Sequence, residues 1–353
     1  MISLLGLLGF VALLSTALRP AGGAMQQVTG REPLAARGNH IPGRIRILAV
    51  GDINLGRAVG QAILEGDTAY PFAAVADTFA AYDVVFANLE SCLSDQKGET
   101  QDPVYNLVFT GPPAGAWSLR GAGVTMVSTA NNHALDYGLG ARIETMRNLD
   151  SAGIAYAGTS LDSSRLHGPA LLVRRGIRIG LFACTDIMNR EGEGWKRYVA
   201  YADTGTVLPK IRSWRDSLDL LIVSYHGGDE YAEKPSRRTR QFAEAVIGAG
   251  ADLFLGHHPH VPYGIESHGG KLVVHSLGNF VFRQPARYWT QHSYALSAEV
   301  VKDSLGTRIE EYHLLPVRSG FQPTFAVNAD ERAEIMERAQ LLSTEAVAER
   351  LAW

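Results

Sequence analysis

Apolar and polar positions alternate in blocks along the chain, and this pattern predicts an α/β protein. Short runs rich in β-branched and aromatic residues, typical of buried strands, cover 44–50, 83–87, 124–129, 154–158, 218–225 and 251–256. Longer stretches with helical character cover 59–64, 72–81, 112–123, 139–151, 206–216 and 236–248. Because the two kinds of segment alternate, we expect parallel strands joined by helical crossovers.

Hairpin patterns are interspersed with these units. Residues 169–184, 261–278 and 294–317 are each typical of two antiparallel strands, and the first two turn at Arg175-Gly176 and Gly269-Gly270. Polar stretches over 91–111 and 186–205 predict long loops, the first of them at the rim of a site. A charged, alanine-rich stretch over 328–351 predicts a terminal helix. Together these patterns indicate two packed sheets flanked by helices.

The most informative polar residues come at the ends of the apolar runs. They are Asp52, Asn88 with Glu90, Asn131 to His133, His226, and His257 to His260. Loops past the carboxyl ends of buried strands are where α/β proteins place their chemistry. Oxygen and imidazole ligands gathered from five such ends are what a binuclear hydrolytic centre needs.

Local spacing supports a common site. In an extended chain residues i and i+2 face the same side, so we expect Asn88 and Glu90 to point together. The same argument pairs His258 with His260, and Pro259 favours extended geometry at His258.

A predicted helix over 139–151, closed near Gly153, follows Asn131–His133. Its start would offer free backbone N–H groups to an anion.

Six motifs resemble those of the CapA family, the bacterial capsule or poly-γ-glutamate synthesis proteins with a metallophosphatase-like fold. In order from about residue 45 to about residue 283 they are GDINLGR, NLE, ANNHALDYG, HGGDEY, GADLFLGHHPHV and HSLGNFVF. The resemblance implies a four-layer α/β/β/α sandwich of two packed mixed sheets flanked by helices.

The family is similar to calcineurin-like phosphoesterases, and this similarity implies roles for individual residues. Two divalent metal ions, Mn, Fe or Zn, would be held by Asp52, Glu90, Asn132, His226, His258 and His260. His133 would protonate the leaving group. Substrate binding, or support of the ligands, would fall to Asn88, Arg57, Asn131, His257, Glu230 and Asn279.

Three departures from the related patterns stand out. Asp52-Ile53-Asn54 replaces an Asp-x-His pattern, and Asn88-Leu89-Glu90 replaces Gly-Asp-x-x-Asp. Gly227 stands where the family usually has Trp, which we expect to widen the pocket or to remove an aromatic wall.

Structural interpretations of the same residues remain open. Asp52 could cap a helix, and Asn88 or Asn131 could bond its own backbone in a turn, which for Asn131 is the favoured interpretation. Arg57 could bind an anionic substrate or pair with a surface carboxylate.

Composition narrows the functional classes. The chain has 353 residues, 46% of them hydrophobic, with a net charge of −3, so it can bury a large core. It has no basic stripe, and we expect no nucleic-acid partner. Cys92 and Cys184 could pair, although two separate thiols are the default expectation.

Residues 1–24 hold an apolar run and a small-residue cleavage site, so they predict a signal peptide or a membrane anchor and an extracytoplasmic location. The alternative interpretation is a buried core helix. A linker over 25–43, a CapA-type domain over 44–320 and a helical extension over 321–353 would follow.

Three functional hypotheses follow. The first is an exported hydrolase that uses metal-bound hydroxide on a phosphoester or an amide-like bond. The second is a membrane-tethered assembly or export factor that binds an anionic polymer, within a capsule synthesis complex, without turning it over. The third is a binuclear-metal phosphoesterase unrelated to capsule. A retained anchor would favour the assembly factor, and release would favour an enzyme.

Overall fold

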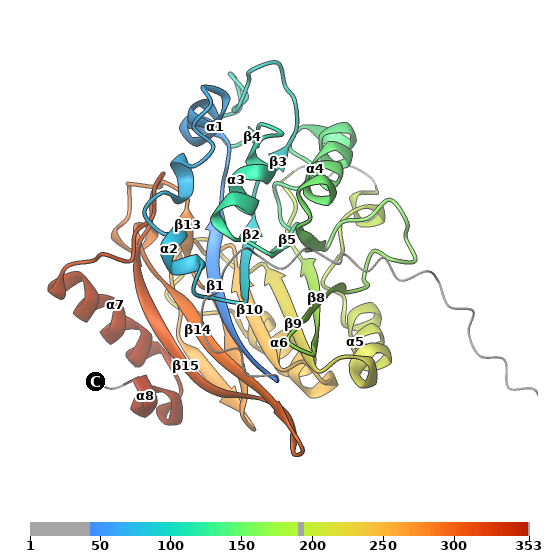
Figure 1. The fold of residues 1–353 in the computed structure, drawn as a ribbon, viewed down its shortest axis with the longest axis vertical. Helices are drawn as coiled ribbons and strands as arrows, with labels where there is room; N and C mark the ends of the chain where they lie inside the picture. The colour runs from blue at the N-terminus through green and yellow to red at the C-terminus, as the bar shows by residue number, and fades with distance from the viewer. Residues whose placement is uncertain (1–42, 190–193, 352–353) are drawn as a thin grey trace, which may run out of the picture.

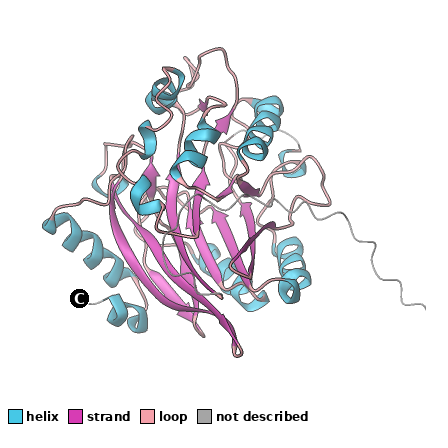
Figure 2. Cartoon of the chain, in the orientation of Figure 1, coloured by secondary structure: helices cyan, strands magenta, loops and turns pink. Residues whose placement is uncertain are grey.

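The computed structural model describes residues 43–189 and 194–351, and strands fill its centre while helices lie at its periphery (Figures 1 and 2). A seven-stranded sheet has the order β15-β14-β1-β2-β5-β6, with β13 paired to β1. Its strands are β1 (Arg44–Ile53), β2 (Val84–Leu89), β5 (Met126–Ser128), β6 (Ala155–Ala157), β13 (Asn279–Val281), β14 (His292–Asp303) and β15 (Gly306–Arg318).

A six-stranded sheet has the order β11-β12-β10-β9-β8-β7. Its strands are β7 (Ala170–Arg174), β8 (Ile177–Thr185), β9 (Leu220–His226), β10 (Leu253–His257), β11 (Ile265–His268) and β12 (Lys271–Val274). A small parallel pair, β3 (Cys92–Leu93) and β4 (Thr110–Gly111), lies within the predicted loop over 91–111.

The helices are α1 (Arg57–Leu64), α2 (Ala76–Phe79), α3 (Gly115–Ala122), α4 (Gly138–Ala152), α5 (Thr204–Trp214), α6 (Arg237–Ala249), α7 (Ala329–Leu342) and α8 (Glu345–Leu351). Single turns of 3-10 helix cover Tyr70–Phe72, Trp195–Arg197, Arg215–Ser217 and Tyr288–Thr290. No helix in the described ranges combines the length and the apolar character needed to cross a bilayer. The predicted leader over 1–24 and nearly all of the linker over 25–43 lie outside those ranges.

Alternation along the strands builds three separate cores. Ile45 and Ile47 of β1 face the second sheet, where they join a core with Ile179 and Ile222. Leu48 of β1 points the other way, into a core with the side chains of α1, α2 and α3. Strands β8 and β9 pack their outer faces against α5 and α6 in a third core. Three cores separate four layers, so the predicted α/β/β/α sandwich is confirmed.

Two predicted helices are interrupted. The terminal stretch over 328–351 forms α7 and α8, because Ser343 adopts an extended conformation at the end of α7. Its hydroxyl accepts the backbone N–H of Ile265 at 2.8 Å, which ties the break to β11. The stretch over 72–81 is a 3-10 turn followed by the four-residue α2.

Cys92 and Cys184 are both buried and free, which confirms the expectation of two separate thiols. Cys92 lies under the turn that carries His133, whereas Cys184 packs in the core beside α5 and α6. They therefore belong to different parts of the fold.

Candidate metal centre

Parallel pairing brings the polar strand ends into register. Asp52 on β1 is paired with Asn88 on β2, and His226 on β9 is paired with His257 on β10. The Nδ2 atom of Asn88 donates to Asp52 Oδ1 at 2.9 Å and lies 3.1 Å from His226 Nδ1. Asn88 therefore connects the two sheets at one end of the sandwich.

Asp52 is buried among imidazoles. Its Oδ1 atom lies 3.1 Å from His257 Nδ1, and its Oδ2 atom lies 3.4 Å from His260 Nδ1. Burial alone would raise the pKa of Asp52, but the hydrogen bonds and charges of His257 and His260 hold it well below its ordinary value. An ionised carboxylate at this position suits a metal ligand better than a helix cap.

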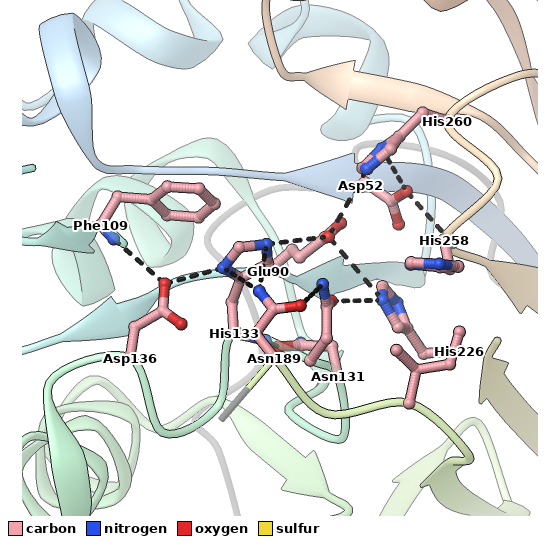
Figure 3. Close-up of polar contacts among 12 residues, drawn as sticks. Asp52, Glu90, Phe109, Asn131, His133, Asp136, Asn189, His226, His258 and His260 are labelled. Carbon is pink, nitrogen blue, oxygen red and sulfur yellow. Dashed lines mark hydrogen bonds and ion pairs between the residues drawn. The ribbon is translucent and has the colours of Figure 1, made fainter. Parts of the chain in front are cut away.

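Glu90 lies at the centre of the cluster (Figure 3). Its Oε1 atom is 3.8 Å from His133 Nε2, 3.7 Å from His226 Nε2 and 3.9 Å from His260 Nε2. Both carboxylate oxygens are buried, and neither has a hydrogen-bond partner. Burial, reinforced by the charge of Asp52, raises the pKa of Glu90 well above its ordinary value. A carboxylate so placed needs a proton or a cation.

Burial favours the neutral form of two of the histidines, His226 and His258. Burial lowers the pKa of His226 well below its ordinary value, and that of His258 to about 3. Neutral imidazole is the ligating species. The His258 Nδ1 and His257 Nε2 atoms are also buried without partners.

Three groups of ligand atoms lie close enough to share an ion. They are Glu90 with His226 and His258, Asp52 with Glu90 and His260, and Glu230 with His258 and His260. Within each group the atoms lie within 4.8 Å of one another. Glu90 belongs to two groups, so one buried carboxylate could serve two neighbouring ions. The orphaned atoms of Glu90 and His258 show that the donor set fits divalent metals.

Asn132 turns its oxygen toward the centre. Its Oδ1 atom lies 2.8 Å from His226 Nε2, and its Nδ2 atom donates to Asn189 Oδ1 at 2.8 Å. Asn189 therefore fixes the orientation of the Asn132 amide. The Asn189 Nδ2 atom also lies 3.4 Å from both ring nitrogens of His133.

His133 is held from two sides. Its Nδ1 atom lies 2.7 Å from Asp136 Oδ2, which also accepts the backbone N–H of Phe109 at 3.0 Å. The Phe109 ring stacks on the imidazole with centroids 4.1 Å apart. The carboxylate and the ring leave His133 Nε2 directed toward Glu90 (Figure 3).

Asn131 and Asn279 position other residues. Asn131 donates to the carbonyl of Leu89 at 2.8 Å and accepts the N–H of His133 at 3.2 Å, which matches its expected turn role. Asn279 places its Oδ1 atom 2.9 Å from His260 Nδ1, which orients that ring.

The structure departs from two local expectations. His258 and His260 have φ values of 95° and 59°, so the predicted extended pair is wrong, although both rings reach the centre. Gly227 opens no pocket on its Cβ side, because an added Cβ would lie 2.1 Å from Asp186 Oδ1; the loss of an aromatic wall stays a prediction. Helix α4, from Gly138 to Ala152, confirms the predicted helix, and a turn separates it from Asn131–His133.

Asn54 stands at the third position of the Asp52-Ile53-Asn54 segment, where the expected pattern Asp-x-His has a histidine. Its Oδ1 atom accepts the backbone N–H of Gly56 at 2.7 Å. The side chain therefore shapes the turn before α1, and its oxygen is used by the backbone of Gly56.

Three residues around the centre were absent from the predicted set. Asp136 lies in the ANNHALDYG motif, and its spacing from His133 could have indicated a partner. Phe109 and Asn189 lie at the end of one predicted loop and in another, where no periodicity marks them. Glu230, which was predicted to support the site, is exposed at its rim.

Comparison with known proteins places these motifs in a family. The model described as "Bacterial capsule synthesis protein PGA_cap" matches residues 46–284. The PGA biosynthesis protein CapA of Bacillus subtilis (strain 168) is 34% identical over 249 residues, which cover 69% of this chain and 63% of that protein. The capsule biosynthesis protein CapA of Bacillus anthracis is 28% identical over 307 residues, 84% of this chain and 72% of that protein. The chain thus spans less than two thirds of the Bacillus subtilis relative.

Two solved structures have some likeness to this chain. The calcineurin-like phosphoesterase YfkN from Bacillus subtilis has a TM-score of 0.46 and 12% identity, over 88% of this chain and 99% of that one. A putative 5'-nucleotidase from Staphylococcus aureus has a TM-score of 0.46 and 14% identity, over 83% of this chain and 58% of that one.

Proposed function

The chain belongs to the PGA_cap family of bacterial capsule synthesis proteins, and we propose that it is a metal-dependent hydrolase of capsule or poly-γ-glutamate biosynthesis. Its substrate would be an anionic polymer or a phosphoester. The apolar leader over 1–24 supports an extracytoplasmic location, either secreted or tethered beside a membrane-bound synthesis complex.

One observation carries the proposal. Glu90 is buried with two unpartnered oxygens and has three imidazole nitrogens within 3.9 Å of Oε1. A carboxylate in this state needs a proton or a cation, and the imidazole nitrogens around it are groups that ligate a cation. The bound metals, held by Asp52, Glu90, Asn132, His226, His258 and His260, would supply a hydroxide nucleophile and neutralise developing charge.

The chain's own residues complete the chemistry. His133, held by Asp136, would deliver a proton from Nε2 to the leaving group. The stacked ring of Phe109 shields one face of His133 from water. Asn189 and Asn131 would keep Asn132 and the following turn in place while the substrate binds.

Elemental analysis of the full chain tests the proposal. We expect one to two Mn, Fe or Zn per chain in the parent, and loss of most of it in a His258→Ala/His260→Ala double variant. His313→Ala removes an exposed histidine from β15 and is the matched control. Turnover of phosphoesters and γ-glutamyl oligomers is then measured with the metal-loaded parent. A parent that takes up no metal when Mn and Zn are supplied contradicts the proposal.

A non-catalytic assembly factor is the second candidate. The observation that favours it is Asn54, whose side chain is committed to the backbone of Gly56 and leaves the centre without that nitrogen ligand. This function predicts polymer binding in the absence of metal and no turnover of any of these substrates.

A further inference from the structure

Arg57 stands out by its backbone. It is the first residue of α1, and its φ of 55° lies in the left-handed region that a bulky side chain seldom adopts. Its N–H donates to Thr100 O at 2.9 Å, and Thr100 Oγ1 donates to its carbonyl at 2.9 Å. Strain that is held in place in this way is a frequent mark of functional sites.

The Arg57 guanidinium lies one ring away from the candidate centre. It is 4.8 Å from the Phe109 ring and 5.9 Å from the Phe282 ring. Phe109 stacks on His133, and the Phe282 ring centroid is 5.0 Å from that of His260. The two phenyl rings therefore connect a fixed cation to two residues of the centre.

The donors of Arg57 are largely unused. One terminal nitrogen donates to the carbonyl of Asn106 at 3.0 Å, and Nε is buried without a partner. In the described ranges, 43–189 and 194–351, no carboxylate forms an ion pair with it. Burial lowers the pKa of Arg57, and the charges of Glu90 and Asp136 act against that shift. Arg57 was expected either to bind an anionic substrate or to pair with a surface carboxylate, and no described carboxylate is in place for the second role.

A second arginine approaches His260 through another ring. Arg287 lies 4.6 Å from the Tyr231 ring, and the centroid of that ring is 6.0 Å from that of His260. Tyr231 has a φ of 60°, and its hydroxyl interacts with Gln284 Nε2 at 3.3 Å. Arg287 is exposed, and its guanidinium forms no ion pair with a carboxylate in the described part of the chain.

We propose that Arg57 and Arg287, with the rings of Phe109, Phe282 and Tyr231, form an anion subsite beside the metal centre. This arginine–aromatic rim binds a carboxylate or phosphate of the substrate that is separate from the group being cleaved. The inference rests on the proposed function, because it assigns the substrate of the same site. The subsite favours polymer chains that carry an anionic group on successive units over neutral esters or amides.

The chemistry of guanidinium supports this choice. Its planar fork matches the two oxygens of a carboxylate or phosphate. Stacking on aromatic rings holds the guanidinium in place, so the arginine side chain loses less conformational freedom when an anion binds. Glu230 is an exposed acid of this region, beside the exposed Asp229, and it would repel an anion unless a cation held it with His258 and His260. Anion binding at the rim is therefore expected to strengthen when metal is present.

Equilibrium binding to the full chain tests the subsite. The probes are a fluorescent γ-linked glutamate oligomer, the same oligomer with its carboxylates converted to amides, and inorganic phosphate. We expect the acid oligomer to bind, the amide oligomer to bind about tenfold more weakly or not at all, and added salt to weaken binding. Competition by phosphate separates a general oxyanion site from one that requires a carboxylate chain.

The variants assign the effect to the rim. Arg57→Gln should weaken binding of the acid oligomer about tenfold, and Arg287→Gln, being exposed, about threefold. Arg283→Gln is the matched control, because Arg283 is an exposed arginine stacked on Phe321, at 5.5 Å, and its aromatic partner is not part of the rim. Arg57→Lys keeps the charge without the fork and should fall between parent and Arg57→Gln. If Arg57→Gln does not fold, Arg287→Gln and Arg57→Lys carry the test.

Several outcomes would overturn the subsite. They are equal binding of acid and amide oligomers, equal losses in Arg57→Gln and Arg283→Gln, or no binding of either anionic probe. A protein without metal or turnover that still binds the acid oligomer through Arg57 would sink the hydrolase but keep the subsite. If the parent turns over substrate but Arg57→Gln binds the acid oligomer as tightly as the parent does, the hydrolase stands and the subsite is overturned.

Discussion

The Oδ2 atom of Asp136 lies 2.7 Å from Nδ1 of His133, and this contact leaves Nε2 as the ring nitrogen that faces Glu90. Asp136→Asn should therefore weaken delivery of a proton to the leaving group. We expect kcat to fall about 100-fold or more, with metal content unchanged, because general acid catalysis contributes about 10²–10⁴-fold. Rates with a metal-loaded variant check this prediction.

Leaving-group dependence distinguishes a lost acid from a distorted site. p-Nitrophenolate leaves without being protonated, so hydrolysis of a p-nitrophenyl ester should slow much less in Asp136→Asn than hydrolysis of an alkyl ester. Equal losses for the two esters would contradict the proposed role of the pair. Glu144→Gln is a control outside the centre, because Glu144 is a half-buried residue of α4 whose carboxylate accepts the backbone N–H of Asp95 at 2.9 Å.

Glu90→Gln should have opposite effects on the metal-free and the metal-loaded protein. The folded pKa of Glu90 is raised above the unfolded value of about 4.3, so its favourable contribution is present at low pH and is lost as pH rises through the folded pKa. At neutral pH the metal-free variant should then melt higher than the parent, by about 2–4 °C per kcal/mol of relief.

Metal should reverse the order of the two proteins. The parent gains stability on loading with Mn or Zn because the ions bind only the folded state, whereas the variant lacks the shared carboxylate and should gain little. Thermal unfolding with and without metal measures both effects. A metal-free variant that melts lower than the metal-free parent would show that Glu90 is satisfied by something other than a cation.

The pKa of Glu266 is shifted in the opposite direction to that of Glu90. Its Oε1 atom lies 2.8 Å from His275 Nε2, and hydrogen bonds from His275 and His268 lower the pKa of Glu266 to about 2, against desolvation. The stability it contributes is present above the unfolded pKa of about 4.3 and is lost as pH falls toward 2. Glu266→Gln should cost about 1–2 kcal/mol at pH 7, discounted for its partial exposure. The difference from the parent should shrink in unfolding curves measured toward pH 3.

Much of the fold and the centre follows from patterns in the sequence. Period-two spacing correctly directs Asn88 and Glu90 to the same side, because β2 is a regular strand up to Leu89. Strand ends that carry polar residues meet because the strands are parallel and in register, as Asp52 and Asn88 show. These features depend on local geometry, which the sequence encodes directly.

Other features depend on tertiary contacts that spacing does not encode. His258 and His260 reach the centre through left-handed backbone and not through an extended pair. Ser343 interrupts the terminal helix because its hydroxyl binds Ile265 N on a distant strand. Asn189 contacts Asn132 and His133 from a loop without periodicity. For Ser343 and Asn189 the contacting residues are remote in sequence.

His257 is placed to support the centre, as the sequence predicts, and it belongs to none of the three groups of ligand atoms. Its Nδ1 lies 3.1 Å from Asp52 Oδ1, and its Nε2 is buried without a partner. His257→Gln should lower metal affinity about 10–100-fold, since groups that orient a ligand carboxylate commonly contribute that much. Competition with a chelator measures the affinity. His275→Gln is the control, because His275 is also a buried histidine paired with a carboxylate, Glu266, outside the proposed ligand set. Equal affinity in His257→Gln and the parent, or equal losses in both variants, would show that His257 is only part of the core.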